Sequence, residues 1–364
     1  MPFAAEPEFS HRRAGRTAVL LCNLGTPEAP TAAALRRYLA QFLSDQRVVE
    51  IPRLAWWPIL HGIILRTRPA KSARKYASIW TPEGSPLRVW TEKQATLLRG
   101  YLGERGHDVL VRGAMRYGQP AIAGVLDELK AEGAVRLLVL PLYPQYSGPT
   151  TASVIDAVAA WLPTIRSVPE MRIVNHYHDD AGYIVALAKR VTDHWMVHGR
   201  AQRLVLSFHG VPQRTLQLGD PYHCECRKTA RLLGERLGIG KDELVVTFQS
   251  RFGKAQWLQP YTEPTLRELA RQGVRRVDVM CPGFTSDCLE TLEEIGIEAR
   301  AAFLEAGGET FHYIACLNDQ HEWLAALAQI AITHLQGWPT KARPDPNELE
   351  VREQRARSLG APAR

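Results

Sequence analysis

Residues 203–212 read RLVLSFHGVP, an apolar run that ends in the polar pair His209-Gly210 and a proline. Residues 18–27 read AVLLCNLGTP and follow the same plan. Apolar runs of about 4–8 residues rich in Val and Leu are typical of strands buried on both faces of a parallel sheet. The two stretches therefore predict two equivalent strands, each followed at its carboxyl end by polar residues.

Further runs of this kind alternate with helical patterns along the chain. The additional strands are expected at 109–113, 135–140, 244–248 and 277–280, and helices at 122–130, 228–237 and 265–271. Strands that alternate with helices indicate an α/β fold, in which crossover helices cover the faces of a parallel sheet.

The two halves of the chain also repeat a longer pattern. Residues 116–118 (RYG) and 251–253 (RFG) each follow a strand, and each is followed by a helix and by a strand that ends in proline, at Pro141 and Pro282. A repeat this long indicates a duplicated domain rather than a solenoid. We predict two Rossmann-like lobes, residues 17–168 and 169–338, each with a parallel sheet flanked by helices. Parallel sheets bind ligands at the carboxyl ends of their strands, so we expect the site in a cleft between the lobes. Residues 339–364 are predicted to form a charged, flexible tail.

Composition places the protein among folded enzymes. Its 364 residues are 45% hydrophobic and 23% charged, which suits two globular domains and excludes wholesale disorder. The longest apolar run is far shorter than the roughly 18 residues that span a bilayer, and residues 1–16 contain no apolar signal-peptide core. We therefore expect a cytoplasmic protein whose six cysteines are free thiols.

The net charge of +7 has no clear nucleic-acid signature. Part of the excess lies at the two ends of the chain, and basic residues are not interleaved with aromatics in any strand or helix that could read bases. No nucleic-acid partner is therefore predicted. A basic surface also suits an anionic small molecule or the anionic cytoplasmic face of a membrane. Neither half contains a G-x-G-x-x-G or Walker sequence, so nucleotide binding has no support.

His209 is the first candidate for chemistry. An imidazole at the mouth of an apolar strand, followed by glycine, is placed as a general base or a metal ligand would be. A histidine that only bonds to loop carbonyls would give the same local pattern, and for an isolated histidine that interpretation is the simpler one.

Acidic residues near 287–294 form the second candidate. A helix that begins near Asp287 would place Asp287, Glu290 and Glu294 along one face, at i, i+3 and i+7. Three neighbouring carboxylates raise the pKa of at least one of them and attract a cation. Alternatively, Asp287 and Glu290 are a capping pair at a helix N-terminus.

Residues 54–74 combine Trp56-Trp57 and Ile63-Ile64 with clustered arginines. Such a segment suits a hydrophobic lip at a membrane surface or over a pocket for a flat apolar anion. A buried amphipathic helix is the alternative. The segment Cys224-Glu225-Cys226 looks like a metal-binding motif but lacks the cysteine spacing of a zinc site. The sequence also contains no compact set of four cysteines that could hold an iron–sulfur cluster.

Several short motifs together resemble those of bacterial ferrochelatases, which insert ferrous iron into a porphyrin. The resemblance extends from about Ala18 to about Trp338. The matching segments are 23–27 (NLGTP), 84–87 (GSPL), 115–117 (MRY), 142–147 (LYPQYS), 207–210 (SFHG), 219–222 (GDPY), 248–250 (FQS) and 284–287 (FTSD), with 290–292 (ETL) close behind. Each segment alone is weak, but their order and separation are specific.

The resemblance implies a chelatase-like pair of lobes with a porphyrin cleft between them. It implies that His209 and Glu290 face each other across the cleft as catalytic and metal-binding residues, with Asp287 and Glu294 behind them as an acidic path. The positions that match porphyrin-contacting residues of the family are Arg116, Tyr117, Ser147, Trp257, Tyr76, Ser85, Trp56 and Trp57. Of these, Trp56 and Trp57 lie in the segment that matches the family's lip over the cleft.

The expected function is that of a lyase, a ferrochelatase that inserts Fe²⁺ into protoporphyrin IX to form protohaem in haem biosynthesis. A coproporphyrin ferrochelatase, and a cobalt or nickel chelatase acting on a sirohydrochlorin-type ring, are the alternatives within the same class. A two-lobed, non-catalytic metal- or haem-binding protein is the alternative from another class. Fe²⁺ is expected as substrate, with no tightly bound cofactor. The chain after Cys316 has no cysteine, so no [2Fe-2S] cluster is expected.

Overall fold

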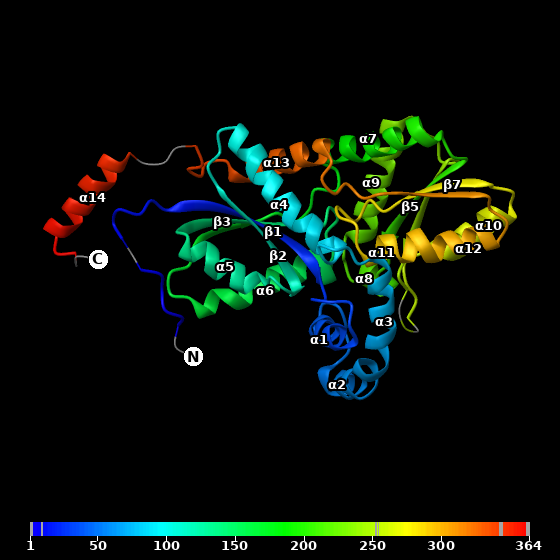
Figure 1. Ribbon diagram of the computed structural model, residues 1–364, viewed down its shortest axis with the longest axis horizontal. Coiled ribbons are helices and arrows are strands. Elements are labelled where there is room, and N and C mark those ends of the chain that lie inside the picture. Colours follow the sequence, from blue (N-terminus) through cyan, green and yellow to red (C-terminus); the bar gives the residue numbers. More distant parts are fainter. Residues whose placement is uncertain (1–2, 9, 252, 254, 342–344, 362–364) are drawn as a thin grey trace.

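The chain folds into two α/β lobes that lie side by side along the long axis of the molecule (Figure 1). The computed structural model describes residues 3–8, 10–251, 253, 255–341 and 345–361. The first sheet, in the order β2-β1-β3-β4, is built from β1 (Arg16–Thr26), β2 (Leu110–Gly118), β3 (Ala134–Pro141) and β4 (Glu170–Ile173). The second, in the order β6-β5-β7-β8, is built from β5 (Arg203–His209), β6 (Leu244–Gln249), β7 (Arg276–Met280) and β8 (Thr310–Ile314).

The two sheets have the same topology, which confirms the predicted duplication. All neighbouring strands are parallel. Equivalent details recur: the Met115 amide donates to the Pro120 carbonyl at 2.7 Å, and the Phe248 amide donates to the Pro260 carbonyl at 2.8 Å. β1 and β5 occupy equivalent central positions, and Asn23 and His209 lie toward the carboxyl ends of these two strands.

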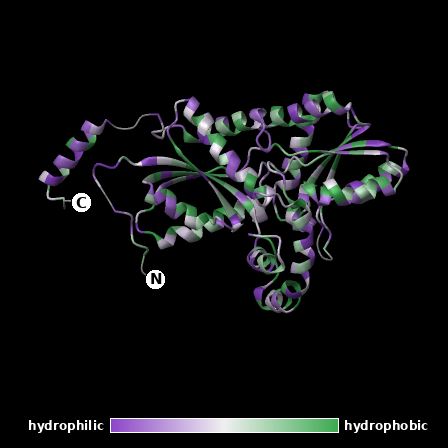
Figure 2. Cartoon of the chain, viewed as in Figure 1, coloured by the Kyte–Doolittle hydropathy of each residue, from purple (hydrophilic) through white to green (hydrophobic). Residues whose placement is uncertain are grey.

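Helices cover both faces of each sheet. Those of the first lobe are α4 (Pro86–Glu104), α5 (Ile122–Ala131), the π-helical turn η2 (Gly148–Ala152), α6 (Ser153–Trp161) and the short 3₁₀ turn η3 (Leu162–Thr164). Those of the second are α7 (Ala181–His198), α8 (Gln213–Gln217), α9 (Tyr222–Leu237), α10 (Thr262–Arg271), α11 (Leu289–Leu292), the π-helical turn η4 (Glu294–Ala299) and α12 (Arg300–Glu305). The last helix before the tail, α13 (His321–Leu335), returns to the first lobe and packs against α4, β3 and α7. The strands are predominantly hydrophobic, and the helices have mixed faces (Figure 2). In β1, residues 18–22 are fully buried, as expected for a central strand with helices on both sides.

A helical protrusion extends from the junction between the lobes (Figure 1). It consists of α1 (Ala32–Leu43), α2 (Arg53–Ile59), the π-helical turn η1 (Leu60–Ile64) and α3 (Leu65–Ile79). Residues 54–74, predicted as one helical segment, thus form a helix interrupted by a π turn just after Pro58. Proline lacks the amide hydrogen that a regular helix needs at this position, so a local change of helix type is understandable.

Two predicted boundaries differ from the structure. β4 pairs with β3 and belongs to the first sheet, although residues 169–173 were assigned to the second lobe. Part of the expected flexible tail forms helix α14 (Pro346–Ser358), which begins with the Asp345 side chain accepting from the Asn347 amide at 2.9 Å. Arg352 in this helix donates to the backbone carbonyls of His11 and Arg13 at 2.6 and 2.7 Å, so α14 lies against the N-terminal segment.

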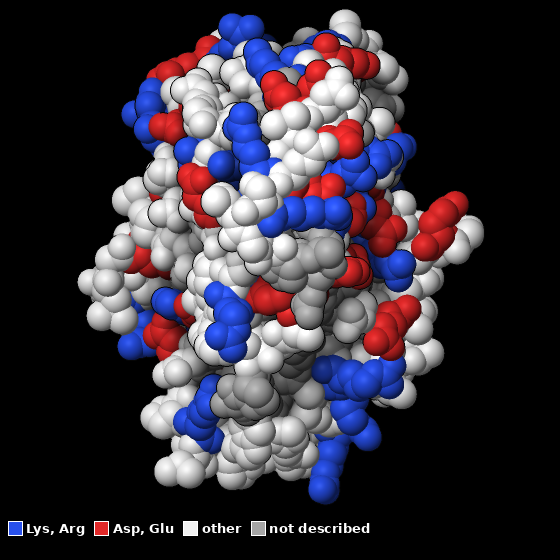
Figure 3. Space-filling model, turned by 90° about the vertical axis from the view of Figure 1, so that its left-hand side faces the viewer, with Lys and Arg blue, Asp and Glu red and all other residues white. Residues whose placement is uncertain are grey.

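Among the described residues, no helix is long and apolar enough to cross a membrane. Lysine and arginine side chains are interspersed with aspartate and glutamate over the end of the molecule that Figure 3 displays. The positive net charge is therefore not gathered into one basic band on that face.

Candidate functional site

A cavity lies between the lobes, where the loops that follow the central strands approach each other. Its apolar walls are Leu24, Phe42, Leu87, Leu142, Tyr143, Val211 and Phe284, and its polar lining includes Asn23, Gln145, Ser147, His209 and Glu290. The predicted pair His209 and Glu290 therefore lines the same cavity, and Ser147 joins them from the first lobe. An apolar hollow with a few polar groups is the usual form of a small-molecule site.

His209 is held at the end of β5 with one ring nitrogen engaged. Its Nδ1 lies 2.6 Å from the carbonyl oxygen of Gly210. Because a carbonyl can only accept, Nδ1 carries the proton in the neutral ring and Nε2 has a lone pair. Gly210 is needed for this arrangement, since a Cβ there would lie 2.7 Å from the Gln249 carbonyl oxygen. His209 thus satisfies a loop carbonyl and still presents a nitrogen that can take a proton or bind a metal ion.

Glu290 reaches the same cavity from a short helix, α11. α11 begins after Cys288, where the Cys288 amide donates to the Thr291 hydroxyl at 2.9 Å in a capping box. The predicted capping pair of Asp287 and Glu290 is therefore wrong: Cys288 and Thr291 cap the helix. Glu290, in the first turn, is only partly buried and keeps its carboxylate at the cavity.

Gln249 connects the histidine strand to the acidic helix. Its Nε2 donates to the backbone carbonyl of Glu290 at 2.7 Å and approaches Glu294 Oε2 at 3.4 Å. Its Oε1 accepts from the Ser207 hydroxyl at 2.6 Å. Gln249 lies beside His209 in the sheet register, so this one amide fixes the position of both sides of the site.

Glu294 lies behind Glu290 at the start of η4. Its carboxylate accepts hydrogen bonds from the Ser250 amide at 2.7 Å and the Ser250 hydroxyl at 2.5 Å. Burial raises the pKa of Glu294, and the neighbouring Glu290 adds to this effect, although Ser250 and His209 partly oppose it. A carboxyl with a raised pKa can exchange a proton near neutrality more readily than an ordinary glutamate.

Asp287 does not share a face with the two glutamates. It precedes the helix, and its buried carboxylate accepts from Tyr313 Oη at 2.5 Å, from Asn318 Nδ2 at 2.6 Å, and from the Cys316 amide at 3.2 Å. Its oxygens thus tie the loop to β8 and the segment that follows. The expectation that Asp287 continues an acidic row is wrong, because the helix begins at Leu289 rather than near Asp287.

Arg116 and Tyr117 belong to a buried cluster centred on Asp45. Asp45 Oδ2 accepts from Arg116 at 2.6 Å, from the Tyr117 hydroxyl at 2.7 Å and from the Ser153 hydroxyl at 2.6 Å. Burial acts to raise the pKa of Asp45, but the hydrogen bonds of Ser153 and Tyr117 and the charge of Arg116 outweigh it and lower that pKa. The Tyr117 ring packs edge-on against Phe42 at 5.0 Å, so these residues support a cavity wall from behind.

Ser147 lines the cavity and is tied to the second lobe. Its hydroxyl donates to Asp220 Oδ2 at 3.2 Å, and the Gly148 amide donates to the same oxygen at 2.7 Å. Trp257 is not among the residues that line the cavity; its ring packs against Gly210, the residue after His209, and its backbone pairs with Pro212.

The remaining predicted contacts are spread over the protrusion and its base. Tyr76 is buried between Tyr38 and Trp80, with ring centroids 6.5 and 6.3 Å away. Ser85 is buried and accepts a hydrogen bond from Thr26 at 2.7 Å. Neither residue is part of the cavity lining.

The two lip tryptophans have different roles. Trp56 is buried, and its indole donates to the Leu43 carbonyl at 2.7 Å. Trp57 is 48% exposed and packs beside His61. One face of the segment is therefore core and the other is an exposed apolar surface, and the lip over a pocket or at a membrane stays a prediction.

Sequence reasoning missed several residues of the site. Tyr143 lines the cavity with a buried hydroxyl that has no hydrogen-bond partner among the described residues. Asn23, near the carboxyl end of the equivalent strand β1, donates to Thr91 at 3.1 Å. The repeat of the strand ends could have pointed to Asn23, and Tyr143 belongs to the segment 142–147 that resembles ferrochelatases. Asp45 had no local signal, because its partners are 71 to 108 residues away in sequence.

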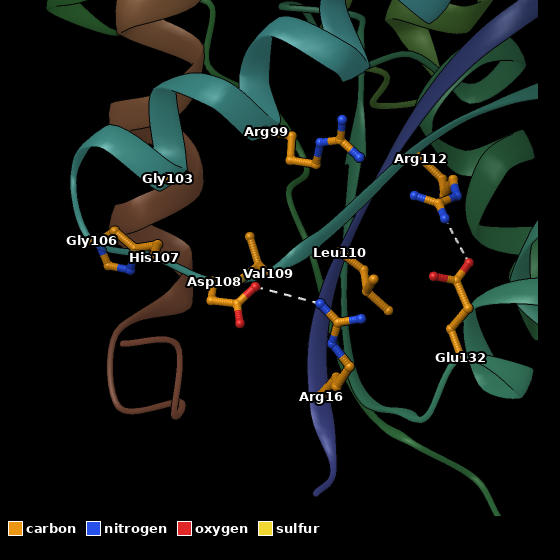
Figure 4. A pocket seen from close by; sticks show the side chains of 10 residues that line it. All are labelled: Arg16, Arg99, Gly103, Gly106, His107, Asp108, Val109, Leu110, Arg112 and Glu132. Atoms are coloured by element: carbon orange, nitrogen blue, oxygen red, sulfur yellow. Dashed lines mark hydrogen bonds and ion pairs between the residues drawn. The ribbon is translucent and has the colours of Figure 1, made fainter. Parts of the chain in front are cut away.

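A second hollow lies at the amino ends of the first sheet, away from this site (Figure 4). Its arginines are mostly paired: Arg16 with Asp108 at 3.4 Å and Arg112 with Glu132 at 2.7 Å. Because β1 runs from Arg16 to Thr26, the length of that strand separates this hollow from the carboxyl-end cavity.

Comparison with known proteins settles the family. The ferrochelatase family model matches residues 16–335. The chain belongs to the ferrochelatase family. The ferrochelatase of Methylibium petroleiphilum is 72% identical over 100% of both chains, and that of Polaromonas sp. is 68% identical over 100% of both. The ferrochelatase of Herminiimonas arsenicoxydans is 63% identical over 98% of this chain and 96% of its own length.

Solved structures confirm the two-lobed chelatase-like fold of this ferrochelatase family member. SirB from Bacillus subtilis with Fe³⁺ aligns with a TM-score of 0.53 and 14% identity, over 90% of this chain and 100% of SirB. CbiX, described as the terminal enzyme of sirohaem biosynthesis in denitrifying bacteria, aligns with a TM-score of 0.50 and 14% identity, over 88% and 100%. At this identity the likeness concerns the fold alone.

Proposed function

We propose that this protein is a ferrochelatase that inserts Fe²⁺ into protoporphyrin IX and releases protohaem, a lyase of the metal chelatase type. The observation that carries the proposal is the pair His209 and Glu290 on one apolar-walled cavity between the lobes, in a chain of the ferrochelatase family. Fe²⁺ is the substrate in this scheme, and no resident cofactor is required.

The reaction must remove two pyrrole protons and deliver a metal ion to four nitrogens. His209 Nε2 has the lone pair needed to accept a proton or to hold the ion, because Nδ1 is committed to Gly210. Glu290 supplies a negative charge that attracts the cation. Glu294, whose pKa is raised, can receive a proton from Glu290. Gln249 holds the Glu290 backbone and reaches toward Glu294, which keeps this acidic pair in register.

The cavity walls suit a flat, largely apolar ring. Leu24, Phe42, Leu87 and Leu142 come from the first lobe, and Val211 and Phe284 from the second. Walls from two lobes can press on opposite faces of a macrocycle, and binding energy from its apolar periphery can help to bend it so that nitrogen lone pairs point toward the metal. The Asp45 cluster stiffens one of these walls through Phe42.

The exposed face of the protrusion supports a second part of the proposal, peripheral contact with an anionic membrane surface. Leu54 is 94% exposed, Ile63 59% and Trp57 48%. Arg53, Arg66 and Lys71 are also exposed on the same segment. Apolar side chains beside basic ones are the combination that holds a peripheral protein at an anionic interface. An apolar porphyrin could then enter from the membrane side.

The number of carboxylates on the ring distinguishes the candidate substrates. Protoporphyrin IX is the proposed substrate because apolar side chains dominate the cavity walls. Coproporphyrin and sirohydrochlorin-type rings carry more carboxylates and would need more basic groups around the site. The cavity-lining residues include one histidine and one glutamate but no lysine or arginine within the described part of the chain.

Insertion assays test the proposal. Purified protein is mixed anaerobically with Fe²⁺ and, in separate reactions, with protoporphyrin IX, coproporphyrin or sirohydrochlorin. Conversion of the protoporphyrin spectrum to that of haem, with slower conversion of the other rings, is expected. Failure with Fe²⁺, Zn²⁺ and Co²⁺ alike would leave a non-catalytic binding protein as the better interpretation. His209→Ala should abolish insertion but leave the circular dichroism spectrum and the melting temperature almost unchanged.

A further inference from the structure

A group of histidines surrounds a buried aspartate at the far end of the second lobe. Asp278 in β7 is fully buried, and His312 pairs with it in register on the neighbouring strand β8. His194 comes from α7, the helix that covers this face of the sheet. Asp278 is level with Leu204 in β5, five residues before His209. At about 3.3 Å per residue, the group lies roughly 16 Å from His209 along the strand.

The candidate ligand atoms converge on one point. Asp278 Oδ1 lies 3.2 Å from His312 Nδ1 and 3.4 Å from His194 Nε2. These three ligand atoms lie within 4.8 Å of one another. A tetrahedral ion with metal–ligand bonds of about 2.1 Å separates its ligand atoms by about 3.4 Å. The two separations from Asp278 Oδ1 are therefore close to those that a small divalent ion requires.

His194 has a buried nitrogen that the protein does not satisfy. Although Nε2 is near Asp278, its orientation does not make a hydrogen bond, and it has no hydrogen-bond partner among the described residues. A buried polar atom without a partner costs about 1–3 kcal/mol. A metal ion between the two side chains would satisfy it.

The surroundings hold the carboxylate as a metal site requires. Trp195 donates its indole N–H to Asp278 Oδ2 at 2.8 Å, which leaves Oδ1 toward the histidines. His198 lies one helical turn after His194, with its ring 4.5 Å from that of His194 and 4.9 Å from that of His312. Such outer contacts fix ligand orientation in metal sites.

We propose that His194, Asp278 and His312 form a second metal site that binds a divalent transition ion such as Zn²⁺, Co²⁺ or Fe²⁺. Imidazole and carboxylate together suit these ions rather than Mg²⁺ or Ca²⁺, which prefer oxygen ligands. The ion would fasten α7 to β7 and β8. This site is separate from the cavity and does not depend on the proposed chelatase activity.

Another group needs a control, because His176, His178 and Glu225 also place ligand atoms within 4.8 Å of one another. There, Glu225 Oε2 already accepts the Tyr146 amide at 2.7 Å, and Oε1 lies 2.6 Å from His176 Nδ1. These contacts already engage both carboxylate oxygens of Glu225 and one nitrogen of His176, although His178 Nδ1 in this group, like His194 Nε2, is buried without a hydrogen-bond partner among the described residues. His176→Ala is therefore the matched control, since it removes an imidazole from a similar histidine–carboxylate group.

The test is a Co²⁺ titration of the full-length protein, in which His209→Ala and Glu290→Ala remove the cavity ligands. One equivalent of Co²⁺ should bind with visible ligand-field bands, and it should raise the melting temperature. His194→Ala combined with His312→Ala should weaken binding by more than about tenfold and cancel the thermal shift, whereas His176→Ala should change neither. If that double variant folds poorly without metal, Asp278→Asn, which can still accept from Trp195, replaces it and should give the same loss. Unchanged Co²⁺ affinity in these variants, or its loss in His176→Ala instead, would overturn the proposal.

Discussion

The side-chain amide of Gln249 donates a 2.7 Å hydrogen bond to the backbone carbonyl of Glu290 and so joins the end of β6 to the helix that carries the acidic group. The contact is part-buried, and the same side chain accepts from Ser207 within the core of the second lobe. Gln249 is not among the residues that line the cavity, so we expect it to act on the reaction by positioning Glu290.

Gln249→Leu should therefore impair turnover more than substrate binding. The change leaves the Glu290 carbonyl and the Ser207 hydroxyl without their partner, at a cost of about 1–3 kcal/mol in the free energy of unfolding. A small displacement of Glu290 should lower kcat by about 10- to 100-fold, with a smaller change in KM for porphyrin. Gln272→Leu, at an exposed glutamine whose side chain donates to Glu268 in the preceding helix α10, is the control. A variant with normal kcat would show that Glu290 needs no such support.

The raised pKa of Glu294 predicts how stability depends on pH. Because its folded pKa lies above the ordinary value of 4.5, the folded state holds the proton more tightly than the unfolded state. This favourable contribution is complete below about pH 4.5 and is lost as pH rises through the folded pKa. Glu294→Gln has no such titration. Its melting temperature relative to wild type should therefore rise from pH 4.5 toward neutrality.

Melting curves of both proteins across that pH range give the measurement. Glu268→Gln, at an exposed position, should show a difference from wild type that hardly varies with pH. A Glu294→Gln difference that is equally flat would mean that Glu294 titrates as an ordinary glutamate. The lost hydrogen bonds to Ser250 give a constant offset and do not alter the slope.

Local patterns were sufficient to predict the central strands and the duplicated plan. Residues 18–22 and 204–206 are uniformly apolar, and both lie in central strands. β4 (EMRI) and β8 (TFHYI) lie at sheet edges, where one side needs no second neighbour and polar residues are allowed. Because of this mixed composition, the apolar pattern did not predict β4 and β8. The position of β4 in the first sheet follows from pairing with β3, which local sequence does not specify.

The candidate site was predictable only where one residue type at one strand end carried the signal. His209 follows from the strand that precedes it. Asp287 was misplaced because a run of acids does not reveal at which residue the helix begins, and the Cys288–Thr291 cap decided that. The Asp45 cluster depends on contacts between three distant segments, so no window of sequence contains it.

Asp45 should matter for stability more than for porphyrin affinity. Asp45→Ala leaves the Arg116 guanidinium, which is 17% exposed, without its carboxylate and also removes a partner of the Tyr117 hydroxyl. Breaking a buried ion pair in this way costs about 3 kcal/mol or more. Urea unfolding should show that loss, while Asp45→Asn, which retains an acceptor oxygen, should lose less. Asp156→Ala is the control, because its pair with Arg47 is nearly half exposed and should be worth under about 1 kcal/mol. A large rise in KM with normal stability would instead place Arg116 in contact with the ring.

The exposed face of the protrusion should govern membrane binding. Trp57→Ser with Ile63→Ser should reduce co-sedimentation with anionic vesicles, because the two side chains are 48% and 59% exposed and available to insert. Met196→Ser with Val197→Ser is the matched control, since these residues are at least as exposed but lie at the end of α7 in the other lobe. Equal binding by both double variants would assign any vesicle affinity to another surface. Trp56 is unsuitable for this test, because it is buried and bonded to Leu43.

Tyr143 offers a prediction with opposite signs for stability and binding. Its buried hydroxyl lines the cavity and has no partner among the described residues, so the folded protein bears the cost of desolvating it. Tyr143→Phe should therefore raise the free energy of unfolding by about 1 kcal/mol when no porphyrin is bound. If the hydroxyl instead bonds to bound porphyrin, the same change should weaken binding several-fold, measured by fluorescence quenching of the free-base ring. Tyr183→Phe is the contrasting control, since its hydroxyl donates to the Pro282 carbonyl at 2.5 Å and its loss should destabilise the fold. A Tyr143→Phe protein that is less stable than wild type would show that the hydroxyl already has a partner, such as an ordered water molecule, in the free protein.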